Sequence, residues 1–156
     1  MSRPLIAVVG GSACTPQEAE WAAATGRLIA EAGAVLLCGG LGGVMEAAAR
    51  GAKAAGGLTV GLLPGPDPAA ANPSIEIALA TGLGEMRNAL LVRAAGAVIA
   101  IGGGWGTLSE IALACRMRTP IVGLHDAFTG AVEIPRKERP EDAVAWALEQ
   151  ARHREV

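Results

Sequence analysis

The sequence predicts an α/β fold in which a doubly wound parallel sheet carries helices on both faces. Short apolar runs alternate with helical segments along most of the 156 residues, and this alternation is typical of parallel sheets covered by helices. Glycine clusters follow three of the apolar runs and precede helices. Since ligands of such sheets bind outside the carboxyl ends of the strands, these clusters also mark the expected binding edge.

Apolar runs bounded by glycine, proline or polar residues predict six strands. These runs occupy residues 4–9, 34–38, 58–63, 75–80, 97–101 and 120–124. Helices are predicted over residues 16–32, 44–55 and 86–95, from Thr107 onward, and over 140–154. The first of them has a clear start signal, because Thr15 suits the N-cap, Pro16 the first helical position and Glu18 a capping box.

Composition indicates one domain over residues 1–156. Hydrophobic residues make up 51% of the chain and charged residues 18%, with a formal net charge of −2. This balance provides no basic footprint, so no nucleic-acid partner is expected. The apolar run at the N-terminus is too short for a membrane span and lacks a signal-peptide cleavage region, which predicts a cytoplasmic protein with no membrane partner.

The cysteines and histidines do not form a recognisable metal or disulfide pattern. Cys14, Cys38 and Cys115 are odd in number and widely spaced, which favours reduced thiols. No Cys-x-x-Cys pair occurs, and the histidines are His125 and His153, so no metal site is predicted. Cys14 and Cys38 are interpreted as small packing residues near strand ends.

Three glycine-rich segments contain the candidate ligand-binding residues. Backbone N–H groups can approach a ligand closely at glycines, and a helix N-terminus favours negative charge, so phosphate is the natural ligand. The alternative is that the glycines serve only tight turns and close helix packing. The candidates are Gly10, Gly11, Ser12, Gly39, Gly40, Gly42, Gly43, Gly103, Gly104, Trp105, Gly106 and Thr107.

Two common nucleotide-binding motifs are absent from the sequence. No GxxxxGK[ST] segment occurs, which excludes a standard P-loop. The GxGxxG pattern is incomplete at both later clusters, and no acidic residue ends the second predicted strand to bind a ribose hydroxyl. A mononucleotide or another phosphate-bearing ligand is therefore favoured over a dinucleotide.

Two charged residues stand out in apolar surroundings. Glu110 follows the third glycine cluster, and it can be a site residue or the closing residue of a second capping box that begins at Thr107. Arg87 begins a predicted helix, and it can bind phosphate bidentately or be a solvated helix residue. Trp105 within the glycine loop can cover a flat ring or simply shield the loop.

The segments GGLGGVMEAAARGA, LLPGPD and GGGWGTLSE, in this order, resemble the Rossmann-like LOG-type superfamily. That superfamily includes cytokinin-activating phosphoribohydrolases and proteins labelled lysine decarboxylase-like, and the resemblance covers residues 4–124. The enzymes' hallmark, PGGxGTxxE, is matched from Gly103 to Glu110, and Arg87 stands at the separation of the enzymes' catalytic arginine. The resemblance therefore implies catalytic roles for Arg87 and Glu110.

Two residues depart from the enzyme pattern: Gly102 stands where the enzymes carry Pro, and Asn88 where they carry Lys. The segments TGLGxxRN and LPGPD and the GGG-type loop are more similar to a short branch that includes molybdenum-cofactor carrier proteins, which bind a phosphorylated pterin. Two functions stay open. One is hydrolysis of the N-glycosidic bond of a nucleoside 5′-monophosphate, and the other is non-catalytic carriage of a molybdopterin-type ligand or sensing of a nucleotide.

The resemblance carries three further expectations. No cofactor is required for either function, although a nucleotide or a molybdopterin-type ligand can be bound. Lysine decarboxylation is not expected, because Lys53 and Lys137 lie in no recognisable pyridoxal site. A homodimer or homotetramer is implied.

Overall fold

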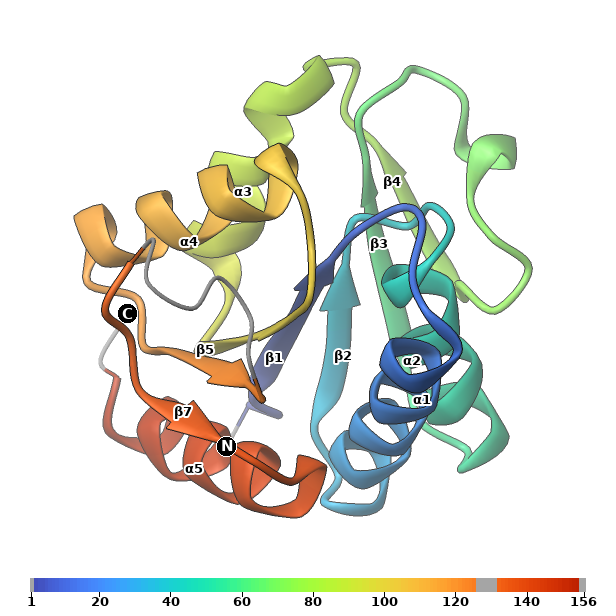
Figure 1. Cartoon of the computed structure of the whole chain (residues 1–156). Helices are drawn as coiled ribbons and strands as arrows, with labels where there is room; N and C mark the ends of the chain where they lie inside the picture. Colours follow the sequence, from blue (N-terminus) through green and yellow to red (C-terminus); the bar gives the residue numbers. More distant parts are fainter. Residues whose placement is uncertain (1, 126–131, 155–156) are drawn as a thin grey trace.

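A computed structural model describes residues 2–125 and 132–154, and in these residues the chain forms a seven-stranded parallel sheet (Figure 1). The order of the strands across the sheet is β4-β3-β2-β1-β5-β6-β7. The predicted α/β class with a doubly wound parallel sheet is confirmed. The strands are β1 (Leu5–Gly10), β2 (Val35–Cys38), β3 (Thr59–Leu63), β4 (Ile77–Ala80), β5 (Ala97–Ile101), β6 (Ile121–Leu124) and β7 (Arg136–Lys137).

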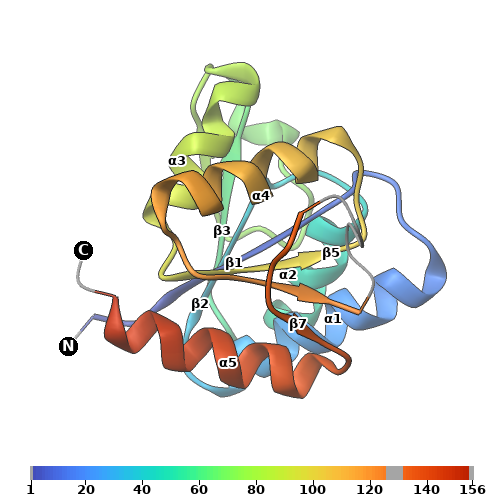
Figure 2. The ribbon, with the colours of Figure 1, turned by 60° about the vertical axis from the view of Figure 1, so that its left-hand side comes forward.

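Helices lie on both faces of the sheet, as the sequence predicts (Figure 2). On one face α1, α2 and α5 pack against the sheet, and on the other α3 and α4 do so. The helices are α1 (Pro16–Glu31), α2 (Val44–Ala54), α3 (Arg87–Ala94), α4 (Trp105–Met117) and α5 (Pro140–His153), with short 3₁₀ segments η1 (Pro68–Ala70) and η2 (Gly84–Met86). Within the described ranges, no helix combines the length and apolarity that a membrane crossing needs.

Alternate side chains of the strands divide the core into two apolar clusters, one on each face. On the face of α1, α2 and α5, Ile6 and Val8 of β1 pack among alanine-rich helix surfaces. On the other face, Ala7 and Val9 of β1 pack with Leu91 of α3. Because the central strands are buried on both faces, they read as continuous apolar runs rather than alternating ones.

The start of α1 has the structure that its sequence predicts. The hydroxyl of Thr15 accepts a hydrogen bond from the N–H of Glu18 at 3.1 Å, and the Glu18 carboxylate accepts from the N–H of Thr15 at 3.3 Å. These reciprocal bonds form the capping box, with Pro16 in the first turn. Gly33 follows the helix with φ of +76°, which favours glycine over residues with a side chain.

The structure shifts two of the predicted boundaries by two residues and adds one strand. The strand expected over 75–80 begins only at Ile77, and a two-residue strand, β7, adds a seventh member that no apolar run signals. The helix expected from Thr107 begins two residues earlier, at Trp105. The last change matters for the site, because it moves Glu110 from the first turn of α4 into the second.

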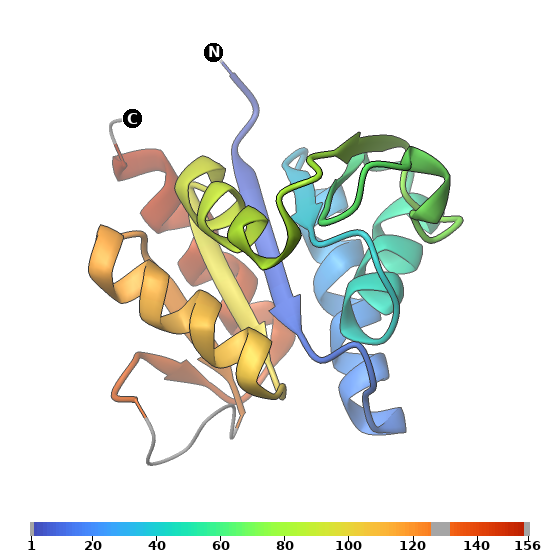
Figure 3. The same ribbon diagram turned by 90° about the horizontal axis from the view of Figure 1, so that it is seen from above.

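The order of the strands reverses at β1, and this reversal positions the site. From β1 the chain builds β2, β3 and β4 to one side, then returns to place β5, β6 and β7 on the other. β1 and β5 are paired neighbours whose carboxyl ends lead to α1 and α4, respectively (Figure 3). A crevice outside the carboxyl ends of strands at such a reversal is the usual ligand site of this architecture.

Candidate functional site

A pocket of about 380 Å³ opens at the carboxyl edge of the sheet, beside the ends of β1 and β5. This volume lies within the range of small-molecule sites. Residues from all three glycine-rich segments, from α3 and from α4 contribute to its wall. The lining residues are Gly10, Gly11, Ser12, Leu41, Met45, Pro64, Glu85, Arg87, Asn88, Gly104, Trp105, Gly106, Thr107 and Glu110.

The glycines of the first segment line the pocket, whereas those of the second do not. Leu41 and Met45 are the lining residues of the second segment, and its glycines are not among them. A side chain on Gly43 would overlap the backbone of Ser12, and one on Gly39 would come within 2.7 Å of Arg87 Nη2. The candidates Gly39, Gly40, Gly42 and Gly43 therefore allow close packing around the pocket instead of lining it.

The third segment places the N-terminus of α4 at the pocket wall. Gly104 is the N-cap, and Trp105, Gly106 and Thr107 form the first turn. The first N–H groups of a helix lack intrahelical acceptors and carry partial positive charge, so this turn can bind an anion. Gly103 is outside the lining and packs against the Thr107 side chain.

Trp105 lines the pocket but is 87% exposed, so most of its ring contacts no other described residue. An indole at this position does not bury the glycine loop. The expectation that Trp105 shields the loop is therefore not what the structure shows, whereas covering a flat ligand ring at the pocket mouth stays a prediction.

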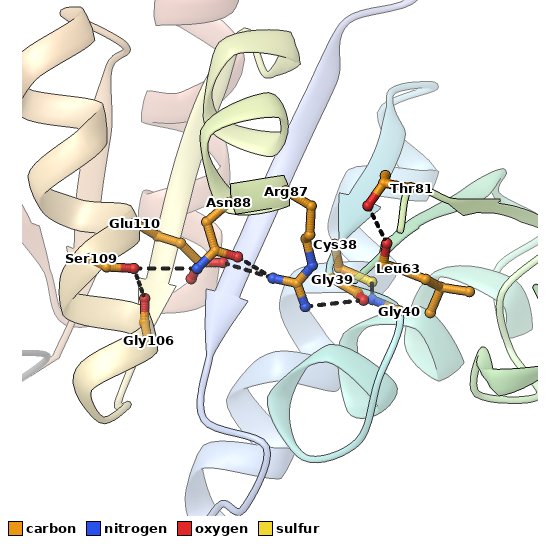
Figure 4. Close-up of polar contacts among 10 residues, drawn as sticks. All are labelled: Cys38, Gly39, Gly40, Leu63, Thr81, Arg87, Asn88, Gly106, Ser109 and Glu110. Atoms are coloured by element: carbon orange, nitrogen blue, oxygen red, sulfur yellow. Dashed lines mark hydrogen bonds and ion pairs between the residues drawn. The ribbon is translucent and has the colours of Figure 1, made fainter. Parts of the chain in front are cut away.

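The capping box expected to begin at Thr107 does not form, and this alternative for Glu110 is wrong. Gly104 caps α4 without any side-chain hydrogen bond, and Thr107 lies inside the helix. The Glu110 side chain is 9% exposed and lies 3.8 Å from Arg87 Nη1, measured from Oε1 (Figure 4). The carboxylate thus turns toward α3 and the pocket rather than back to the helix start.

Arg87 is buried in the pocket wall, which excludes the interpretation as a solvated helix residue. It is 8% exposed as a residue. Its Nη1 donates a hydrogen bond to Oδ1 of Asn88, and its Nη2 donates to the carbonyl oxygen of Gly39 at 3.5 Å (Figure 4). Its Nε is buried and has no hydrogen-bond partner in the structure. A buried guanidinium with an unused donor is suited to an acceptor supplied by a ligand.

Burial changes the ionisation of Glu110. Desolvation raises the pKa of its carboxyl from 4.5 to about 7, and the nearby Arg87 cation opposes that rise. A carboxyl with a pKa near neutrality can gain or lose a proton when a charged ligand enters. The pocket therefore holds one cation beside an acid that titrates close to physiological pH.

Cys38 ends β2 under the same pocket and is fully buried. The N–H of Gly40 donates to its sulfur at 3.4 Å (Figure 4). Burial raises the pKa of the Cys38 thiol from 9.0 to about 11, so it remains a neutral thiol near pH 7. These properties agree with the interpretation of Cys38 as a packing residue rather than a nucleophile.

Sequence reasoning missed five lining residues as site candidates: Leu41, Met45, Pro64, Glu85 and Asn88. Pro64 directly follows β3, so the rule that ligands bind at strand carboxyl ends could have found it. Leu41 and Glu85 adjoin glycines, Asn88 adjoins Arg87, and Met45 lies two residues after Gly43. Packing brings all four to the wall. Lys53 and Lys137 do not line the pocket.

Comparison with known proteins agrees with this architecture. A molybdenum cofactor binding protein from the phototrophic bacterium Rippkaea orientalis has a solved structure that is 38% identical, with a TM-score of 0.87 over 96% of this chain and 98% of that one. The molybdenum cofactor carrier protein of Chlamydomonas reinhardtii is 30% identical, with a TM-score of 0.82 over 98% of this chain and 100% of that one.

An uncharacterized protein of Archaeoglobus fulgidus is 42% identical over 144 residues, which is 92% of this chain and 93% of that protein. The model of the SLOG cluster4 family matches residues 3–152. This match spans all seven strands and the whole pocket wall. The similarity to a short LOG-like branch that includes molybdenum-cofactor carriers is confirmed, and the chain belongs to the SLOG cluster4 family.

Proposed function

We propose that the pocket binds a small phosphorylated ligand of the molybdenum-cofactor type and that the protein carries this ligand without turnover. One observation supports the proposal most strongly: the free first turn of α4 and the buried, unpartnered Nε of Arg87 belong to the same pocket. The helix N-terminus suits a phosphate, and the guanidinium supplies a second donor for an anionic or carbonyl oxygen.

The charges of the pocket suit a ligand of small negative charge. Among the described residues that line it, Arg87 is cationic, and Glu85 and Glu110 are acidic. The raised pKa of Glu110, to about 7, makes this carboxyl partly neutral near pH 7 and so reduces its repulsion of a phosphate. The similar solved structures named for molybdenum cofactor binding and carriage favour a pterin ligand over a free nucleotide.

A second candidate is hydrolysis of a nucleoside 5′-monophosphate to the free base and ribose 5-phosphate. The observation that favours it is the juxtaposition of Arg87 and Glu110, with a carboxyl whose pKa suits general acid–base catalysis. In that reaction Glu110 would activate water or stabilise the positively charged ribose, and Arg87 would orient the phosphate or the leaving base.

One pair of assays separates the two candidates. The purified protein is incubated with AMP and with an N6-modified AMP, and ribose 5-phosphate is measured; molybdopterin binding is measured in parallel by fluorescence. We expect tight molybdopterin binding that Arg87→Ala weakens at least tenfold, and no ribose 5-phosphate. Glu20→Ala, an exposed change on α1, serves as the control.

Release of ribose 5-phosphate that both Arg87→Ala and Glu110→Gln abolish would establish the hydrolase instead. Absence of binding by molybdopterin, AMP and modified AMP alike would refute the phosphorylated-ligand proposal itself. The expectations of a cytoplasmic location and of no nucleic-acid partner stay predictions, and fractionation and a mobility-shift assay with single-stranded DNA test them.

We also propose that the protein forms a homodimer or homotetramer. In the described residues, the exposed large apolar side chains lie on β4, just before and within η2, on α3 and at the start of α4; they are Ile77, Leu79, Leu83, Met86, Leu90 and Trp105. Leu79 pairs with Leu62, which packs on the face of α3, so the exposed side of β4 continues that face. A second copy would cover this surface, which we call the β4–α3 patch.

A further inference from the structure

We propose that Asn88 is a positioning residue that holds the guanidinium of Arg87 apart from the carboxylate of Glu110. The two charged side chains then form only a long ion pair of 3.8 Å and stay within reach of a ligand, instead of closing into a direct hydrogen bond with each other. This assignment deepens the proposed ligand-binding function, since it concerns the same pocket.

Asn88 and Glu110 compete as acceptors for Nη1 of Arg87. Nη1 donates to the amide oxygen of Asn88, and the same Nη1 stays 3.8 Å from the Glu110 carboxylate. A charge-assisted hydrogen bond between these groups would span about 2.7–2.9 Å. Attraction between opposite charges is strong in a buried site, so a neutral amide keeps this nitrogen only if it is itself firmly held.

Asn88 is held from its other side. Its Nδ2 donates to Oγ of Ser109 at 3.2 Å, and that hydroxyl donates to the carbonyl oxygen of Gly106 at 2.7 Å (Figure 4). Asn88 is 5% exposed, so little water competes for these bonds. The relay therefore connects the first turn of α3 to the first turn of α4, the same turn that we propose for phosphate binding.

Arg87 is restrained at a second point as well. Nη2 donates to the carbonyl oxygen of Gly39 at the end of β2, on the opposite side of the guanidinium from Asn88 (Figure 4). With Nη1 and Nη2 both engaged by neutral oxygens, the buried Nε is left without a partner. The arrangement presents Arg87 to the pocket with its charge unneutralised by a direct bond to Glu110.

Arg87 from α3 is the charged group that shifts the pKa of Glu110. Two further ionisable groups lie nearby: Cys38 at the end of β2, whose pKa Glu110 raises, and Glu85 of η2, which lines the same pocket. The thiol of Cys38 is neutral near pH 7. Burial is the main cause of the raised pKa of Glu110, and Arg87 is the neighbouring cation that opposes it. The position of Arg87, which we assign to Asn88, therefore sets how far the cation can lower this pKa.

The test is a ¹³C NMR titration of the Glu110 carboxyl in the ligand-free protein. We expect Asn88→Ala to let Arg87 close on Glu110 and to lower the pKa of Glu110 to about 6 or below, because a directly paired cation lowers a carboxyl pKa by about 1–3. Ser109→Ala, which removes the anchor of Asn88 and the bond to Gly106 but keeps Asn88 itself, should lower it less. Glu20→Ala, an exposed change on α1 that does not line the pocket, should leave it unchanged.

Repeating the substitution in an Arg87→Met protein distinguishes the positioning role of Asn88 from a simple loss of packing. In Arg87→Met the cation is gone, so adding Asn88→Ala should no longer lower the pKa of Glu110. If the pKa falls equally in both backgrounds, water entry explains the change and the proposal is wrong. An unchanged or higher pKa in Asn88→Ala also overturns it, and Asn88→Ser replaces that variant if the alanine protein does not fold.

Because the titration uses no ligand, its outcome is independent of the ligand proposal. Binding of AMP or inorganic phosphate, measured by calorimetry, is then compared among the same variants. If molybdopterin, AMP and phosphate all fail to bind the native protein, the proposed function is refuted, whereas the titration still decides the role of Asn88.

Discussion

Arg87 at the start of α3 and Glu110 in the second turn of α4 lie 3.8 Å apart, and each side chain is 9% exposed. They meet because α3 and α4 pack side by side on one face of the sheet, next to the carboxyl ends of β1 and β5. The pair thus joins two helices at the place where the strand order reverses. Burial and the neighbouring cation together set the pKa of Glu110 at about 7.

The raised pKa of Glu110 predicts a pH-dependent stability. The folded state holds this proton up to about pH 7, whereas an unfolded carboxyl loses it near 4.5. The stabilisation is complete below about pH 4.5 and is lost as the pH rises through about 7. We expect native protein to lose up to about 3 kcal/mol of unfolding free energy relative to Glu110→Gln between pH 5 and 8. Urea unfolding of both proteins across this range measures the difference. Unfolding free energies that change with pH in parallel would contradict the prediction.

The backbone at Gly102 does not fit the proline that the similar enzymes carry at this position. Its φ is +55°, whereas proline requires about −65°, and a Cβ there would overlap the Glu18 carboxylate that closes the capping box. We expect Gly102→Pro to lower the unfolding free energy by about 1–3 kcal/mol. Gly104→Ala is the matched control, because nothing lies within 4 Å of a Cβ at that position. Thermal unfolding compares the two, and equal melting temperatures would refute the prediction.

The contact between α1 and α2 predicts intolerance of larger side chains. A Cβ on Gly26 would overlap the backbone of Ala48, and one on Gly51 would overlap the backbone of Ala23. We expect Gly26→Ala to destabilise the fold by about 1–3 kcal/mol through overpacking, although alanine has the higher helix propensity. Chemical denaturation measures this cost against Glu20→Ala, whose side chain is exposed on the same helix. A stabilised Gly26→Ala protein would show that the helices can separate freely.

The β4–α3 patch predicts the effect of charge on assembly. Met86 is 74% exposed and Leu90 is 45% exposed. Glutamates at both positions would place unpaired charges in an apolar interface, so we expect Met86→Glu/Leu90→Glu to shift the protein from an oligomer to a monomer. Light scattering after gel filtration gives the mass, with Gln17→Glu on α1 as a control for added charge. An unchanged oligomer would assign the interface to another surface.

Local sequence patterns predicted most of the helices and strands. The capping box at Thr15 and Glu18 involves neighbours in sequence, so its residues suffice to predict it. The central strands were found because burial on both faces demands continuous apolar runs. β7 has no such run, and its two residues join the sheet through backbone bonds beside β6. The start of α4 was placed two residues late because Trp105 and Gly106 carry no helix signal, although their backbone continues the helix.

The sequence by itself determined the order of the elements, the all-parallel sheet and the presence of glycines where strands end and helices begin. These features depend on hydrophobic periodicity and on local backbone preference. Only the tertiary structure decided that Arg87 faces Glu110 and that Asn88 accepts a hydrogen bond from Nη1 of Arg87. It also decided that the glycines of the second segment pack behind the pocket. Such relationships depend on burial and on partners distant in the chain, and the same residues in other surroundings would have ordinary pKa values and solvated charges.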